Sequence, residues 1–176
     1  LLAASRIILK NRKILLLQRS KDSNRYPNHW GCPGGKALPH ENEQLSALAI
    51  RSKAHWGYSE EFLRDCVDEL SYTSEQILNS DNWFYVICLQ DQLQAFYQLV
   101  KIKEDVLELE ALFVDPAFVG QGLGKVLFEH AVQLATRMEY SKIDIQSDPN
   151  ATELYLKMGC VQVGELESQS IPGRFL

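Results

Sequence analysis

Residues 107–135, LELEALFVDPAFVGQGLGKVLFEHAVQLA, combine two different repeats of apolar side chains in one stretch. The first part has the two-residue period of a β-strand. Its alternating sets are Leu107, Leu109, Ala111 and Phe113 on one side and Glu108, Glu110, Leu112 and Val114 on the other. Asp115-Pro116 ends this strand, because proline cannot donate to a ladder and restrains the residue before it. From Leu123 onward apolar residues recur at helical spacing, so the stretch predicts a buried strand, a loop and an amphipathic helix.

The loop between the predicted strand and helix contains Gly120, Gly122 and Gly124. Glycines there allow a tight turn and a close approach of a ligand to the backbone. The amides of a helix N-terminus, together with the helix dipole, favour an anion such as a phosphate. A glycine-rich turn without any ligand is the alternative. No Gly-Lys-Ser/Thr follows, as a Walker loop requires, and no acidic residue ends a second parallel strand about 20 residues on, as a Rossmann unit requires.

Two segments resemble the Gcn5-related N-acetyltransferase (GNAT) family over roughly residues 45–176. The segment FVDPAFVGQGLGKVLFEHA, residues 113–131, is similar to its coenzyme A loop, Gln/Arg-x-x-Gly-x-Gly/Ala. Gly122 and Gly124 match the two small positions, whereas Val119 stands where the family usually has Gln or Arg. The segment DPNATELYLKMGC, residues 148–160, resembles the later Asn-x-x-Ala-x-x-Tyr-x-x-x-Gly-Phe pattern, with Cys160 in place of the aromatic residue.

The resemblance implies an α/β fold with a mixed, largely antiparallel sheet, the acyl-CoA N-acyltransferase fold, and acetyl-CoA as the cofactor. The pantetheine arm would lie where the central strand and the next parallel strand splay apart, and the pyrophosphate would lie on the amides of the glycine loop. The implied cofactor-binding residues are Leu112, Phe113, Val114, Val119, Gly120, Gln121, Gly122, Leu123, Gly124, Lys125 and Asn150.

Acetyl transfer to an amine requires a base for the amine, donors for the oxyanion and a proton donor for the departing thiolate. Tyr155 matches the tyrosine that many members of the family use as general acid, and packing on the core is its alternative role. Glu108 and Glu110 are the candidate bases on the central strand, with Glu110 ranked first. Solvation on an open sheet face is the alternative for both glutamates.

The segment 45–58, LSALAIRSKAHWGY, leads into two predicted helices that, as the resemblance implies, line the side of the acceptor substrate. We predict a first strand over residues 47–53, a helix capped by Ser59 and a short helix capped by Thr73. Lys53, His55, Trp56 and Tyr58 are the candidate substrate-binding residues, with core or rim packing as the alternative for the aromatic ones.

The remaining predicted strands cover residues 82–89, 94–103, 142–146 and 161–166, and a helix is predicted over residues 149–158. The last of these strands would be followed by one that this chain does not contain. An unpaired edge invites a partner, so strand exchange and a homodimer are possible outcomes.

Residues 1–44 are predicted as a separate segment before an acetyltransferase domain over residues 45–176. Residues 5–19 have the pattern of a β-hairpin, and HWGCPGGKALPHE, residues 29–41, resembles the first half of a Nudix hydrolase motif. The later glutamates of that motif are missing. Only Glu41 and Glu43 are available to hold a divalent metal, so we expect no metal site and a remnant that packs as an extension.

The net charge of −5 disfavours nucleic acid and anionic membrane as partners and suits a small-molecule amine. The four scattered cysteines and the lack of a long apolar run suggest a cytoplasmic protein. The leading hypothesis is therefore an acetyl-CoA-dependent N-acetyltransferase acting on a primary amine of a small molecule or an exposed amino group. The alternatives are a non-catalytic acyl-CoA-binding module and a Nudix-type nucleoside diphosphate hydrolase.

Overall fold

The computed structural model describes residues 35–88 and 92–168 with their side chains, and the backbone of residue 89 and of four short strands before residue 35. These strands are β1 Ile8–Lys10, β2 Lys13–Leu15, β3 Leu17–Gln18 and β4 Trp30–Gly31. β1 and β2 pair antiparallel with Lys10 opposite Lys13, which confirms the predicted hairpin, and β3 pairs with β4. Residues 29 and 32–34 of the Nudix-like motif lie outside the described residues, as does the turn at residues 90–91.

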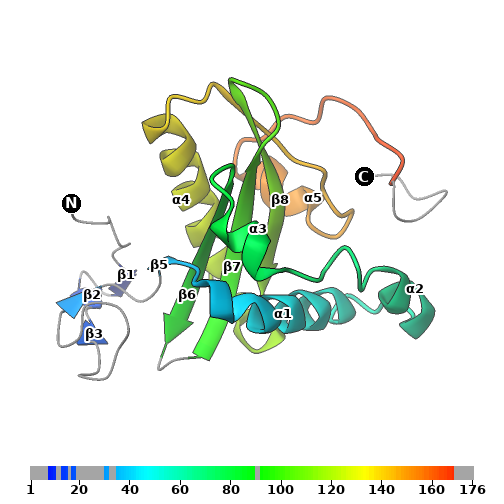
Figure 1. Cartoon of the computed structure of the whole chain (residues 1–176), viewed down its shortest axis with the longest axis horizontal. Coiled ribbons are helices and arrows are strands. Elements are labelled where there is room, and N and C mark those ends of the chain that lie inside the picture. Colours follow the sequence, from blue (N-terminus) through cyan, green and yellow to red (C-terminus); the bar gives the residue numbers. More distant parts are fainter. Residues whose placement is uncertain are drawn as a thin grey trace.

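A five-stranded sheet forms the centre of the fold (Figure 1). Its strands, in spatial order, are β5 Gly35–Lys36, β6 Asn82–Leu89, β7 Gln92–Lys101, β8 Val106–Val114 and β9 Lys142–Asp144. All neighbours are antiparallel except β8 and β9, which are parallel. The predicted mixed, largely antiparallel sheet is confirmed.

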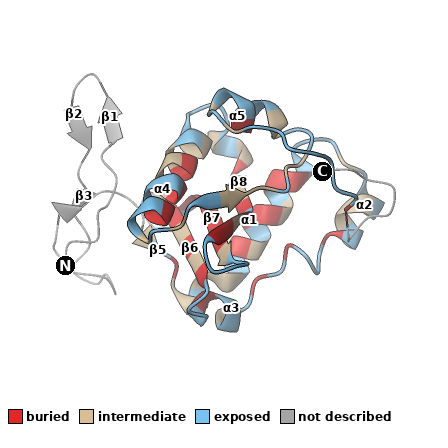
Figure 2. Ribbon diagram, turned by 90° about the horizontal axis from the view of Figure 1, so that it is seen from above, coloured by how far each residue is buried: buried red, intermediate tan, exposed pale blue. Residues whose placement is uncertain are grey.

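Helices cover both faces of the sheet (Figures 1 and 2). The helices are α1 Asn42–Ala54, α2 Glu60–Asp65, α3 Ser74–Leu78, α4 Leu123–Arg137 and α5 Thr152–Lys157, with 3₁₀ turns η1 Pro39–Glu41 and η2 Pro116–Phe118. α1 and α3 share one hydrophobic cluster with β6 and β7, and α4 and α5 share the other with β7 and β8. None of the described helices is both long and apolar enough to cross a membrane.

The predicted strand over residues 47–53 is wrong, because this segment lies inside α1. Leu45, Leu48, Ala49 and Ser52 are all buried, and their spacing places them on one face of a helix. That face packs against the sheet, so burial on a helical period decides the conformation. α1 also begins at Asn42 and β5 lies earlier still, so the sheet and its first helix include residues before the predicted division at 44/45. The division itself stays a prediction.

The strand predicted over residues 161–166 is also wrong, since this segment forms no regular secondary structure. Val161 and Val163 are 80% and 90% exposed. Their alternation matches a strand, but the described residues give them no neighbouring strand to pair with. The predicted caps are confirmed: the side chains of Ser59 and Thr73 accept hydrogen bonds from the amides of Phe62 and Gln76.

The alternation predicted for β8 breaks at Glu110. Leu109 pairs with Leu99 of β7 and Ala111 pairs with Gln98, so Glu110 is the extra residue of a β-bulge. Leu107 and Leu109 belong to the hydrophobic cluster that the sheet shares with α4 and α5, called the α4 cluster below. Ala111 belongs to the cluster that the sheet shares with α1 and α3, called the α1 cluster. Leu112 and Val114 pack against the α4 cluster and Phe113 against the α1 cluster. The prediction that Glu108 and Glu110 share a face with Leu112 and Val114 is therefore wrong, because the bulge shifts the phase of the strand.

Candidate active site

An opening between β8 and β9 lies at the centre of the candidate site. The two strands pair from Val106 opposite Lys142 only as far as Glu108 opposite Asp144. β9 ends there, while β8 continues to Val114. The backbone of β8 beyond Glu108 therefore has no strand on this edge among the described residues, and its polar groups are available to a ligand. The pairing of the two parallel strands thus stops on the part of β8 where the resemblance implies that they splay apart, and the splay itself stays a prediction.

The N-terminus of α4 lies beside the end of β8. Gly122 is the N-cap residue, with φ 81°, and no side chain in the described part of the protein caps the helix. A φ in this region is unstrained only for glycine, and a Cβ at Gly122 or at Gly120 would project into open space. The amides of the first turn lack intrahelical partners and keep their positive end of the helix dipole exposed. This arrangement fits a phosphate group.

Gly124 brings α4 close to its neighbours. A Cβ added there would lie 3.6 Å from Leu154 Cδ2 of α5, 3.7 Å from Leu112 Cδ2 and 3.9 Å from Val114 Cγ2 of β8. The start of α4, the end of β8 and α5 therefore meet at one point. The glycine loop therefore lies beside the part of β8 that has no β9 residue opposite it.

The other predicted cofactor-binding side chains of the loop make few contacts with the rest of the protein. Val119 is 42% exposed, and Gln121 donates from Nε2 to the carbonyl oxygen of Ala117 at 3.5 Å. Lys125 pairs with Glu129 at 3.8 Å on the exposed side of α4, and Leu123 packs against the α4 cluster. Their backbone, rather than their side chains, forms the loop surface.

Tyr155 is buried between α5 and α4, with its ring 5.8 Å from that of Phe128. Its hydroxyl makes no hydrogen bond to any described residue. Burial raises the pKa of the phenol, and the nearby Cys160 and Asp148 raise it further. Tyr155 therefore holds its proton at neutral pH and has a free donor, as a general acid requires.

Glu108 and Glu110 both project on the α1 and α3 face of the sheet. Glu110 reaches solvent, but the surrounding protein removes part of its water, and this partial burial raises the pKa of its carboxyl group. Repulsion from Glu108 and Glu69 raises it further. Burial also raises the pKa of Glu108, whose Oε1 accepts a hydrogen bond from Gln146 Nε2 at 2.7 Å. A carboxylate with a raised pKa is a better base near neutral pH.

Lys53, Tyr58 and Asn150 meet at Asp148, although α1 and the loop after β9 are far apart in sequence. Lys53 Nζ lies 3.3 Å from Asp148 Oδ2, and the Tyr58 hydroxyl donates to Asp148 Oδ1 at 2.8 Å. Asn150 Nδ2 donates to the Tyr58 hydroxyl at 2.9 Å. This polar cluster ties the end of α1 to the loop that precedes α5, and so positions Tyr155.

His55 and Trp56 are not part of this cluster. Both are exposed, and their rings contact each other edge to face with centroids 5.5 Å apart. The sequence predicted Lys53, His55, Trp56 and Tyr58 as one substrate-binding group. The fold separates them into a polar pair, with Lys53 buried and Tyr58 half-buried, and an exposed aromatic pair.

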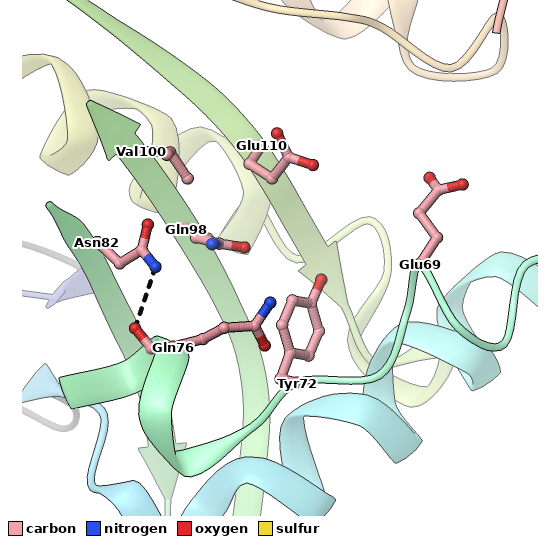
Figure 3. Close-up of a pocket in the computed structure, with 7 residues that line it drawn as sticks. All are labelled: Glu69, Tyr72, Gln76, Asn82, Gln98, Val100 and Glu110. Atoms are coloured by element: carbon pink, nitrogen blue, oxygen red, sulfur yellow. Dashed lines mark hydrogen bonds between the residues drawn. The ribbon is translucent and has the colours of Figure 1, made fainter. Parts of the chain in front are cut away.

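The sequence analysis missed a cavity of about 270 Å³ on the α3 face of the sheet (Figure 3). It is lined by Glu69, Tyr72, Gln76, Asn82, Gln98, Val100 and Glu110. Gln98 had a signal in the sequence: it is a carboxamide inside the otherwise apolar run AFYQLV of a buried strand. Glu69 and Tyr72 had none, because only the fold brings their loop to β8. A second missed contact joins Arg51 to Asp115 at 2.8 Å and holds α1 on the end of β8.

A family model described as the acetyltransferase (GNAT) family matches residues 47–160. The chain belongs to this GNAT acetyltransferase family. It is therefore an N-acetyltransferase, and its cofactor is acetyl-CoA. The match begins after the Nudix-like segment, so the Nudix resemblance stays a prediction.

Two curated relatives have names that refer to N-acetylation. The 5-NmdU N-acetyltransferase of Pseudomonas phage PaMx11 is 26% identical over 132 residues, which cover 74% of this chain and 87% of the phage protein. The N-acetylaspartate synthetase of Danio rerio is 30% identical over 94 residues, which cover 51% of this chain and 33% of the fish protein.

Solved GNAT structures share the fold. The PaiA N-acetyltransferase of Thermoplasma acidophilum, solved in complex with coenzyme A, has a TM-score of 0.63 at 20% identity over 81% of this chain and 93% of its own. A GNAT protein from Rhodopseudomonas palustris has a TM-score of 0.64 at 21% identity over 82% and 90%.

The residues of this chain fit the GNAT cofactor. The uncapped first turn of α4 and the open space at Gly120 and Gly122 suit a pyrophosphate, and the unpaired edge of β8 suits an amide-bearing arm. Val119, the departure from the family pattern, removes one polar side chain but leaves the backbone amides intact.

Proposed function

We propose that this chain transfers an acetyl group to a primary amine of a small molecule or an exposed amino group, with Glu110 as the base and Tyr155 as the acid. One observation carries the proposal. Glu110, a carboxylate with a raised pKa, lies on the part of β8 that β9 leaves unpaired, and the protonated phenol of Tyr155, on the other face of the sheet, has no hydrogen-bond partner among the described residues.

When bound, acetyl-CoA supplies the acetyl group as a thioester. An amine is protonated near neutral pH, so it must lose a proton before it can act as a nucleophile. A carboxylate oxygen of Glu110 takes this proton, directly or through a water molecule. Glu108 supports Glu110 by repulsion, which keeps the pKa of Glu110 raised.

Tyr155 holds a proton at its phenolic oxygen and donates it to the departing thiolate at the end of the reaction. The polar cluster of Lys53, Tyr58, Asp148 and Asn150 keeps α5, and with it Tyr155, at the opening. The free amides of β8 supply donors for the negative charge that develops on the carbonyl oxygen. Leu112 and Val114 contribute these through their backbone.

The proposal is tested by thermal melts and by release of free thiol. Acetyl-CoA should raise the melting temperature by mass action, whereas ADP-ribose with magnesium should not. With acetyl-CoA present, thiol release should depend on added amine. A shift with the nucleotide and metal alone would contradict the proposal and favour Nudix chemistry.

A non-catalytic acyl-CoA-binding module is the second candidate, and the valine at position 119 is the observation that favours it. Binding of acetyl-CoA without thiol release toward any amine would support it. The cytoplasmic location and the homodimer stay predictions, which fractionation and a mass measurement in solution would test.

A further inference from the structure

The cavity beside Glu110 is polar on almost every side. Of its lining side chains only Val100 is apolar; the others are two carboxylates, three carboxamides and a phenol. None of the described residues that line it is basic. A volume of about 270 Å³ is enough for several water molecules or for one small amine.

Two buried polar groups in the cavity have no partner among the described residues. Gln98 is 4% exposed and Tyr72 is 8% exposed, yet neither the carboxamide nor the hydroxyl makes a hydrogen bond within the described part of the chain. Figure 3 shows both groups directed into the space below Glu110. Buried polar side chains are nearly always paired, so these two indicate a ligand.

The charges that line the cavity indicate the sign of the charge on that ligand. Glu69 and Glu110 contribute negative charge from two separate elements, the loop before α3 and the bulge of β8. Glu108 adds a third carboxylate next to Glu110. Repulsion between these groups is relieved by a cation, and no lining side chain supplies one.

We propose that this cavity holds the non-reacting end of the acceptor, and that this end is a second ammonium group. The acceptor is then a small diamine whose reacting nitrogen lies at Glu110. An ammonium group donates three hydrogen bonds, and the Glu69 carboxylate, the Gln98 carbonyl and the Tyr72 hydroxyl oxygen can accept them. The proposal rests on the proposed acetyl transfer and names its substrate class.

The hydrogen-bonding groups and charges of the cavity favour a cationic end of the acceptor over an apolar or an anionic end. Asn82 donates from Nδ2 to the carbonyl oxygen of Gln76 at 3.1 Å, and Gln76 accepts through Oε1 from the amide of Thr73 at 2.8 Å. These bonds hold the α3 side of the cavity in place. An alkylamine with an apolar end would leave Gln98 and Tyr72 unpaired, and a carboxylate end would meet two like charges.

Matched acceptors test the proposal directly. For each chain length from propane-1,3-diamine to hexane-1,6-diamine, the diamine is compared with the monoamine and with the ω-amino acid of the same length, by thiol release from acetyl-CoA. We expect kcat/KM for the best diamine to exceed that of its monoamine by about tenfold, with the amino acid poorest. Equal values for diamine and monoamine, or a preference for the amino acid, would overturn the proposal.

Variants assign the effect to the cavity. E69Q removes one charge with little change in shape, so it should narrow the diamine-to-monoamine ratio by about fivefold or more. D68N removes the same charge from the adjacent residue, which does not line the cavity, and should leave the ratio unchanged. An equal effect of both variants would mean that the charge acts at long range and would contradict a binding site at Glu69.

The failure of this inference can be told apart from the failure of the proposed function. If acetyl-CoA neither shifts the melting temperature nor reacts with any amine, the acetyl transfer itself is refuted. If monoamines and amino acids are acetylated as well as diamines, acetyl transfer stands and only the second ammonium site is refuted.

Discussion

The two faces of the sheet at β8 are built in different ways. On the α4 face, Leu107, Leu109, Leu112 and Val114 pack in an apolar cluster that contains Tyr155, and the surface proposed to bind the cofactor is the backbone of the glycine loop. On the α3 face, polar side chains line a cavity beside Glu110. The bulge at Glu110 separates the two by shifting the phase of the strand.

The comparison suggests how one fold can keep its cofactor and change its acceptor. A surface made of backbone amides tolerates many side chains, as Val119 illustrates. A surface made of side chains changes with every substitution. Function resides in such sites rather than in the fold. The following predictions test whether the two faces have the separate roles proposed for them.

The largest effect is expected on the α3 face, for E110Q. Loss of the base should lower kcat by on the order of 10³-fold without lowering the melting temperature, because Glu110 is exposed and the substitution relieves its repulsion from Glu108 and Glu69. E104Q, in the exposed turn before β8, is the matched control in a thiol-release assay. A nearly unchanged kcat for E110Q would transfer the role of base to Glu108 or to water.

On the α4 face, Y155F should lower kcat by about 10²-fold, because the phenolic proton is lost while the ring still packs on Phe128. The KM for acetyl-CoA should stay the same. Y140F, which alters a half-buried tyrosine outside the site, serves as the control. Activity that survives Y155F with an unaltered pH profile would refute the general acid.

The glycine loop should respond through cofactor binding. G122A forces a residue with a Cβ into φ 81°, which costs about 1 kcal/mol and should raise the KM for acetyl-CoA by about tenfold. G124A places its Cβ at ordinary contact distance and should be milder in both thermal melts and kinetics. Equal effects of the two variants would mean that the backbone conformation at Gly122 does not contribute to acetyl-CoA binding.

The smallest effect is expected for E108Q. The negative charge of Glu108 raises the pKa of Glu110, so its removal should lower that pKa. The base must be deprotonated to act, so activity rises with pH through this pKa. The acidic limb of the kcat/KM profile should therefore move to lower pH, by about half a unit. A shift to higher pH would contradict the assigned repulsion.

The sequence by itself determined the centre of the fold. Residues 107–135 predicted β8, the glycine loop and α4 correctly, because strand period, proline stop, glycine spacing and helical period are local properties. The caps at Ser59 and Thr73 were predictable for the same reason. The glycine loop and the segment around Tyr155 also identified the family and its cofactor.

Only the tertiary structure decided the rest. Residues 47–53 form part of a helix because the face that includes Leu48 and Ala49 packs against the sheet, and no local pattern states that partner. The bulge at Glu110 depends on the register with β7, so it reversed the faces assigned to Leu112 and Val114. Lys53 and Tyr58 contact Asp148, and Glu69 and Glu110 line one cavity, although these residues lie on segments that are distant in the sequence. Pairing of this kind follows from how the whole chain buries its surface, and not from the order of neighbouring residues.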